Sequence, residues 1–154
     1  MENAVLLREV IESDLPILFE HQNEPEANDM AAFPARAWDA FMAHWRKLLA
    51  DESIVKMIII FDGQVAGNIV CFGAANEREV GYWIGKEYWG KGIATRALAA
   101  FLDPLTDRPL YAHVAKHNIG SKRVLEKCGF TISGEDKGFP YSGVEVEEFI
   151  MILE

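Results

Sequence analysis

The chain has 154 residues, half of them hydrophobic and a quarter charged, a composition typical of one globular domain rather than of a disordered or fibrous protein. Its 15 basic and 24 acidic residues give a net charge of −9 with no cluster of lysine and arginine, which argues against direct nucleic-acid binding. No apolar run approaches the roughly 20 residues of a membrane helix, which argues against a membrane-spanning protein.

The first third of the chain is expected to form a strand and two helices. Val5–Val10 is apolar and β-branched, as in a strand, and Pro16 is accepted in the first turn of the helix that follows. The polar segment His21–Arg36 shows no clean period and is interpreted as a loop or a broken helix. Aromatic and leucine side chains then recur at helical spacing and predict a second helix over about Ala37–Ala50.

Three strands are predicted in the middle of the chain. Val55–Phe61 and Gln64–Phe72 are joined by Asp62-Gly63, a strong hairpin signal. The third strand covers Arg78–Gly85, and a glycine-rich turn then leads into a helix that runs to about Leu102.

The last third is expected to hold three strands and one helix. A short strand covers Leu110–Val114, and Asn118 caps a helix that runs to about Cys128. The strands Phe130–Gly134 and Val144–Leu153 flank a loop of turn-forming residues, Glu135–Gly143. The predicted order, β-α-α-β-β-β-α-β-α-β-β, indicates an α/β (α+β) fold with a mixed sheet and helices on both faces. Its amino terminus lacks the features of a signal peptide, so we expect a cytoplasmic location.

The glycine-rich turn is the most informative local feature. Tyr88–Leu98 reads YWGKGIATRAL, an aromatic pair and two glycines that lead directly into helix-forming residues. A strand, a glycine turn and a helix start together gather backbone N–H groups at the positive end of a helix dipole. This arrangement predicts a phosphate-binding site.

Two familiar phosphate-binding patterns fit the turn incompletely. In a P-loop, Lys91 would be followed by serine or threonine to hold magnesium, and the residue there is Gly92. In a dinucleotide fingerprint the third glycine would stand at Thr95. The end of the following strand also lacks the acid that would bind the ribose. A turn that merely enters a helix is the remaining alternative for one short motif.

A second motif selects among these alternatives. Asn118–Phe130 resembles the segment Asn-x-x-Ser-x-(Arg/Lys)-(Val/Leu)-Leu-x-Lys-x-Gly-Phe of the GNAT superfamily of acyl-CoA N-acyltransferases. Trp89–Ala94 resembles the pyrophosphate loop of the same family, (Gln/Arg)-x-x-Gly-x-(Gly/Ala), with Trp89 in place of the commoner polar residue. This variant is similar to the RimJ/RimL branch. The two motifs and the element order together cover about 4–154, which we expect to be one GNAT domain.

The resemblance implies an acetyl-CoA-dependent N-acetyltransferase that uses no metal. In this family a bulge in the strand before the turn splays it from the next strand, and the pantetheine arm of acetyl-CoA pairs with the exposed backbone. The residues expected to bind acetyl-CoA are Trp83, Ile84, Gly85, Trp89, Gly90, Lys91, Gly92, Ile93, Ala94, Thr95, Asn118 and Ser121. Histidine spacing gives no metal-ligand pattern.

The catalytic residues are predicted by analogy with the family. Family members often carry a carboxylate on the strand before the turn, which favours Glu79 as the base, with Glu77 or a water chain as alternatives. Many members use a helical tyrosine as the acid, but Leu125 occupies that position here. Ser121 is the substitute that the RimJ/RimL branch suggests, with Tyr141 as a second candidate.

The acceptor is expected to be a primary amine on a protein N-terminus, an amino acid, a polyamine or another small molecule. Met30, Phe33, Phe139 and Tyr141, from the early and late loops, are the residues predicted to bind it. The final apolar strand could pair across a homodimer. A non-catalytic module that binds or senses acyl-CoA is the alternative function.

Overall fold

The computed structural model describes residues 4–32, 34–141 and 144–154, with the side chains of 138–141, 144 and 145 left undescribed. The strands are β1 Val5–Glu9, β2 Val55–Phe61, β3 Gln64–Phe72, β4 Arg78–Ile84, β5 Leu110–Ala115, β6 Thr131–Tyr141 and β7 Val144–Leu153. The α-helices are α1 Leu15–Gln22, α2 Pro25–Ala31, α3 Trp38–Ala50, α4 Ile93–Leu102 and α5 Ile119–Lys127, with short 3₁₀ turns η1 Glu12–Asp14 and η2 Lys86–Tyr88. Among these helices none is long and apolar enough to span a bilayer.

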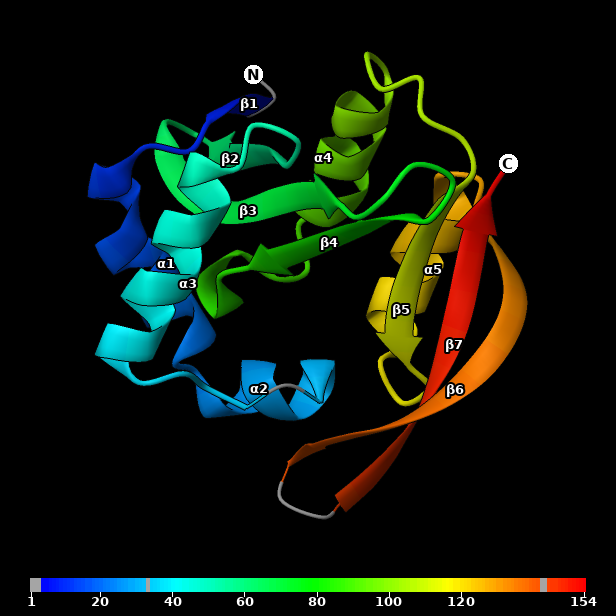
Figure 1. Cartoon of the computed structure of the whole chain (residues 1–154). Coiled ribbons are helices and arrows are strands. Elements are labelled where there is room, and N and C mark those ends of the chain that lie inside the picture. Colours follow the sequence, from blue (N-terminus) through cyan, green and yellow to red (C-terminus); the bar gives the residue numbers. More distant parts are fainter. Residues whose placement is uncertain (1–3, 33, 142–143) are drawn as a thin grey trace.

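The strands form one mixed sheet in the order β1-β2-β3-β4-β5-β7-β6. All neighbours are antiparallel except β4 and β5, which are parallel and pair only at Arg78↔Leu110 and Glu79↔Tyr111. Beyond Glu79 the two strands separate, and Figure 1 shows β4 and β5 diverging into a fork. The splayed mixed sheet that the family resemblance implies is therefore confirmed.

Helices cover both faces of the sheet, each over its own apolar core. Adjacent residues of β2 point to opposite sides, so Ile58 packs against α1 and α3 while Ile59 packs against α4. The core under α1 and α3 contains Leu15, Leu18, Phe41, Met42 and Trp45. The core under α4 and α5 is larger and continues to Leu125, Phe130 and Met151 at the far end of the sheet. The predicted two-faced arrangement is confirmed (Figure 1).

The segment His21–Arg36, predicted as a loop or broken helix, contains the additional helix α2. Pro25 begins α2 in the position where the missing N–H costs nothing, and Ala32 ends it in the left-handed conformation with φ of 54°. α2 lies across the open end of the fork in Figure 1. Lys86 pairs with Glu26 at one end of α2, and the His117 Nε2–H donates to the Asp29 carbonyl at the other, 2.8 Å away.

Two other details differ from expectation. The predicted loop Glu135–Gly143 continues as strand up to Tyr141, because its backbone pairs with β7 at Glu135↔Phe149 and beyond despite its turn-forming side chains. The family bulge is also placed differently. The ladder between β3 and β4 is continuous over 67–72, and the register shift lies between β2 and β3 beside Ile59.

A partly buried ion pair at the start of α1, in which Asp14 is buried and Arg8 is exposed, makes stability depend on pH. The Arg8 guanidinium donates two hydrogen bonds of 2.7 and 2.8 Å to Asp14, whose carboxylate also accepts the Ile11 N–H. These bonds, the Arg8 one foremost, lower the pKa of Asp14. A lowered carboxyl pKa stabilises the fold above the unfolded value of about 3.9, and this stabilisation is lost as pH falls through the folded value.

Asp14→Asn is therefore expected to lower the free energy of unfolding at pH 7 by about 2 kcal/mol. Urea unfolding of both proteins between pH 7 and pH 2.5 measures this difference. The two proteins should approach equal stability at the acid end of the series. A difference that stays constant over the whole pH range would contradict the role assigned to the ion pair.

Candidate active site

The predicted phosphate-binding turn lies where β4 leaves the sheet. Gly90 and Gly92 have φ of 78° and 73°, left-handed values that glycine adopts without strain. Trp89 holds the turn against β4, because its Nε1–H donates to the Ile84 carbonyl at 3.0 Å. Gly92 then caps α4, whose first-turn N–H groups have no partners within the helix. In the described part of the chain, no atom outside the neighbouring residues lies within 4 Å of where a Cβ would stand on either glycine. The backbone is thus open to a ligand.

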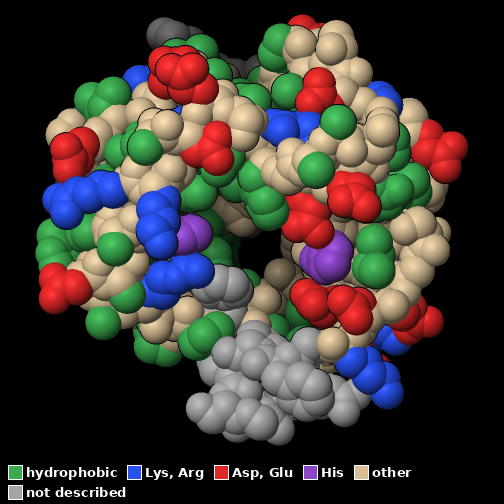
Figure 2. Space-filling model, in the orientation of Figure 1, with side chains coloured by type: hydrophobic (Ala, Val, Ile, Leu, Met, Phe, Trp, Pro, Cys, Tyr) green, Lys and Arg blue, Asp and Glu red, His purple; other side chains and the backbone are tan. Residues whose placement is uncertain are grey.

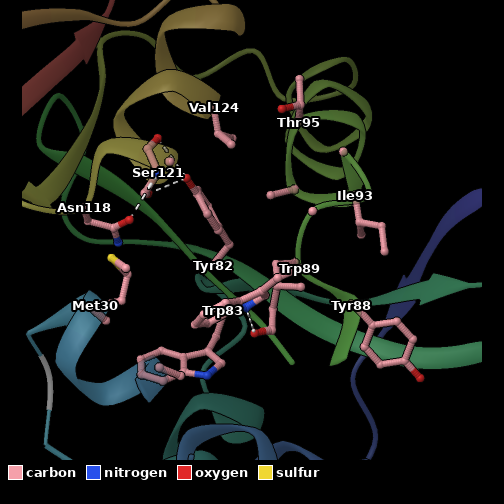
Figure 3. A pocket seen from close by; sticks show the side chains of 17 residues that line it. Met30, Tyr82, Trp83, Tyr88, Trp89, Ile93, Thr95, Asn118, Ser121 and Val124 are labelled. Atoms are coloured by element: carbon pink, nitrogen blue, oxygen red, sulfur yellow. Dashed lines mark hydrogen bonds between the residues drawn. The ribbon is translucent and has the colours of Figure 1, made fainter. Parts of the chain in front are cut away.

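A second helix begins beside the first. The Asn118 side chain caps α5 by accepting the Ser121 N–H at 3.2 Å. Asn118, Gly120, Ser121 and Val124 face the same cavity as the start of α4 (Figure 3). Two helix N-termini, one on each side of the fork, therefore line one cavity, which suits an anionic or polar ligand.

The cavity between these helices has a volume of about 360 Å³. Its walls come from α2, β4, the glycine turn, α4 and α5, and its lining residues include Ala27, Met30, Ala31, Tyr82, Trp83, Ile84, Tyr88 and Trp89. Of the twelve residues predicted to bind acetyl-CoA, ten line the cavity, and Gly85 and Lys91 are not among them. Among the described residues, no strand pairs with this edge of β4 beyond Glu79, so the edge can pair with an extended chain.

Tyr82 was not predicted as a site residue. Its side chain points from β4 toward the start of α5 in Figure 3, and its hydroxyl lies 2.6 Å from the Ser121 Oγ. Burial raises the pKa of Tyr82 to about 12, so the hydroxyl is protonated at any physiological pH. The sequence did carry one signal for Tyr82. Side chains alternate between the two faces of a strand, so Tyr82 lies on the face of β4 opposite Glu79, toward the helices α4 and α5.

Glu79 lies at the base of the fork on the other face of β4. Its carboxylate Oε1 lies 2.9 Å from the His113 Nε2 of β5, and both side chains are about one-third exposed, at 33% and 35%. Glu79 does not line the cavity, and the structure does not bring it to Ser121. His113 was not predicted as a site residue, because it belongs to neither motif and its partner Glu79 lies on another strand.

The four predicted acceptor residues have different outcomes. Met30 of α2 lines the cavity and points toward its interior in Figure 3. Phe33 lies outside the described residues. The backbone of Phe139 and Tyr141 belongs to β6, and their side chains lie outside the described part of the chain. The roles of Phe33, Phe139 and Tyr141 stay predictions.

Comparisons with known proteins agree with this geometry. Residues 4–131 match the family described as Acetyltransferase (GNAT) domain. Spermidine N(1)-acetyltransferase of Escherichia coli (strain K12) is 30% identical over 143 residues, which cover 86% of this chain and 76% of that protein. A Bacillus subtilis (strain 168) protein named ribosomal N-acetyltransferase YdaF is 29% identical over 104 residues. That match covers 63% of this chain and 57% of YdaF, so the chain spans little more than half of that relative.

Solved structures show the same fold. Spermidine N-acetyltransferase from Vibrio cholerae, in complex with CoA and spermine, superimposes with a TM-score of 0.84 at 21% identity, covering 97% of this chain and 94% of that one. Mycobacterium smegmatis RimJ, in complex with CoA-disulfide, gives a TM-score of 0.77 at 21% identity and covers 97% and 81% of the two chains. At these identities the likeness concerns the fold alone.

Proposed function

The chain belongs to the GNAT family of acetyltransferases. We propose that it transfers the acetyl group of acetyl-CoA to a primary amine of a small, cationic, polyamine-like acceptor. The family assignment makes it an acetyl-CoA-dependent N-acetyltransferase. The acceptor class, the residue roles and the extent of a single domain over 4–154 are our proposals. The tryptophan in the pyrophosphate loop and the serine at position 121 support a place in the RimJ/RimL-like branch.

The observation that carries the proposal is the cavity in the fork between β4 and β5. The N–H groups of 91–95 would hold the pyrophosphate of acetyl-CoA, because this backbone is open and lies at the positive end of α4. The unpaired edge of β4 would bind the pantetheine arm as an added strand. Ile93 and Val124 supply apolar walls for the same arm. The described residues therefore fit the cofactor that the family implies.

The charge of the acceptor side supports a cationic acceptor. His113, Asp136 and Glu148 lie on neighbouring strands and place one nitrogen or oxygen each within 4.8 Å of one another. Figure 2 shows acidic side chains gathered beside a histidine over β5–β7, at the rim of a hollow between the two halves of the molecule. With a net charge of −9, this rim would attract an acceptor that carries several ammonium groups.

The reaction needs a base for the acceptor. An alkyl ammonium has a pKa of about 10.4, so it must lose a proton before its nitrogen can attack. Glu79, which lies beside His113 at the base of the fork, would take this proton through water. Acetyl-CoA supplies the activated thioester carbonyl. Ser121, on the opposite wall of the fork, would stabilise the sulfur as the carbon–sulfur bond breaks.

Release of free CoA, followed with DTNB against a panel of amines, tests the proposed function. The panel holds spermidine, a free amino acid, a peptide with a free N-terminus and an aminoglycoside. We expect the highest kcat/KM with spermidine. A preference for the peptide would overturn the acceptor class and leave the transferase intact. Tight acetyl-CoA binding with no thiol release from any amine would support the non-catalytic sensing module instead.

Glu79→Gln is expected to lower kcat with the best acceptor about 100-fold, because the variant cannot accept the proton of the acceptor. Acetyl-CoA affinity should change little, since Glu79 does not line the cavity. Glu77→Gln is the matched control, an exposed glutamate two residues earlier, and should retain wild-type kcat. If Glu77→Gln were the slow variant, Glu77 would be the base. If neither variant were slow, a water chain without either carboxylate would have to remove the proton of the acceptor.

A further inference from the structure

The Tyr82 hydroxyl and the Ser121 side chain form a two-residue unit across the cavity wall. Tyr82 comes from β4 and Ser121 from the first turn of α5, so the pair joins the two arms of the fork. Both residues line the cavity. Among the hydrogen bonds of the described residues, the Tyr82 hydroxyl takes part in two, at 2.6 Å with the Ser121 Oγ and at 3.3 Å with the Ser121 carbonyl.

The chemistry of the two hydroxyls gives this bond a direction. A phenol is the more acidic partner and the better donor, whereas a serine oxygen is the better acceptor. The alternative acceptor for Tyr82, the Ser121 carbonyl, is farther away, at 3.3 Å. Geometry alone allows either oxygen to be the donor, and these preferences favour donation from the Tyr82 O–H to the Ser121 Oγ. The Ser121 proton is then directed away from Tyr82, which leaves it available to the cavity that Ser121 lines.

We propose that Tyr82 is a positioning residue for the acetyl transfer: it orients and polarises the Ser121 hydroxyl, so that Ser121 donates a hydrogen bond to the sulfur that leaves the acetyl group. The inference rests on the proposed function, since it assumes that the acetyl group of acetyl-CoA reaches Ser121. A hydroxyl that accepts one hydrogen bond becomes a stronger donor in the next, because successive bonds polarise one another. Tyr82 thus acts through Ser121 and needs no contact of its own with the sulfur.

The unit stabilises a charge and transfers no proton. When the amine attacks, the carbon–nitrogen bond forms, the carbon–sulfur bond breaks and its electron pair goes to sulfur. The nitrogen, which gave its first proton to the base before the attack, then loses a second proton through water to the solvent. Tyr82, with its pKa raised to about 12, and Ser121 stay protonated beside a thiolate whose conjugate acid has a pKa of about 8.5. The thiolate then takes its proton from solvent.

Titration of the CoA thiol bound to the protein tests the inference without turnover. Ultraviolet absorbance of the thiolate gives the pKa of the bound thiol, which we expect to lie about one unit below that of free CoA. Ser121→Ala and Tyr82→Phe should each bring it back toward the free value. Tyr111→Phe, a tyrosine of β5 outside the cavity lining, is the matched control and should keep the wild-type pKa. A bound thiol with the same pKa in all four proteins would overturn the inference.

Kinetics with the best acceptor supply a second readout. Ser121→Ala should lower kcat about 30-fold and Tyr82→Phe about 10-fold, and in each variant the loss of kcat should exceed any loss of acetyl-CoA affinity. The double variant should be no slower than Ser121→Ala, because Tyr82 acts only through Ser121. Ser121→Thr keeps the hydroxyl and should recover most of the activity. Additive losses in the double variant would show that Tyr82 works independently and would contradict the inference.

The two readouts separate this inference from the proposed function. If no amine were acetylated while the bound thiol titrated as expected, the proposed function would fail and the hydroxyl pair would stand. If the wild-type enzyme acetylated an amine and the thiol pKa did not respond to Tyr82→Phe, the pair would fail and the function would stand.

Discussion

Replacing Gly92 by glutamate is expected to weaken acetyl-CoA binding at least about 1000-fold, a loss of about 4 kcal/mol. Gly92 has φ of 73°, where a side chain costs about 1–2 kcal/mol, so the turn would move its N–H groups away from the pyrophosphate. The new carboxylate would also stand at the start of α4, in the place of the ligand's negative charge. Isothermal titration calorimetry with acetyl-CoA measures the change.

Gly63→Glu is the matched control for this substitution. Gly63 lies in the hairpin between β2 and β3 with φ of 75° and, like Gly92, has open space where a Cβ would stand. Both variants should therefore lose similar stability, but Gly63→Glu should bind acetyl-CoA as the wild type does. Unchanged affinity in Gly92→Glu would mean that the turn does not hold the pyrophosphate.

Gly67→Ala is expected to lower the free energy of unfolding by about 3 kcal/mol. A Cβ on Gly67 would lie 2.2 Å from the Trp83 carbonyl oxygen and 3.1 Å from the Ile84 Cα, and all these atoms belong to backbone that cannot rotate away. β3 and β4 would have to separate at the point where β4 forms the cavity wall. Urea unfolding measures the loss of stability, and acetyl-CoA affinity should fall with it.

Gly81→Ala provides the comparison on the neighbouring strand. The nearest atom to a Cβ there is the Val70 Cγ2 at 3.8 Å, an ordinary van der Waals contact. We expect stability within about 0.5 kcal/mol of the wild type, because alanine suits a strand interior at least as well as glycine. A similar, small effect at both positions would show that β3 and β4 adapt easily and that the close contact has no structural role.

Periodicity predicted the elements whose signal is local. The helix α3 and the strands β2 and β3 begin and end within a residue of their predicted bounds, because their apolar side chains repeat at one period between clear turns. α2 had no such pattern. Its short sequence is held by Lys86 at one end and by His117 at the other, contacts between residues remote in sequence. The extension of β6 likewise depends on pairing with β7 rather than on its own residues.

The part of the site expected to bind acetyl-CoA was predictable because its signals are also local in sequence. The glycine turn and the cap at Asn118 are contiguous motifs, so the sequence carries them in full. Tyr82 and His113 carry no motif, and their importance follows only from their partners, Ser121 and Glu79, which the fold brings to them. Such pairings between remote elements have no signal in a single sequence.

The open backbone of the glycine turn has a consequence for how this protein can change. Contacts made by backbone N–H groups do not depend on side-chain identity, so the proposed phosphate contacts leave the side chain at position 89 free to vary. The proposed acceptor side consists of side chains on other elements, such as Glu79 on β4 and Asp136 on β6, and none of these lies on α4. Binding of acetyl-CoA and choice of the acceptor amine can therefore change independently, both in evolution and in redesign. Substitutions on the proposed acceptor side would alter substrate specificity, while the glycine turn would continue to bind acetyl-CoA.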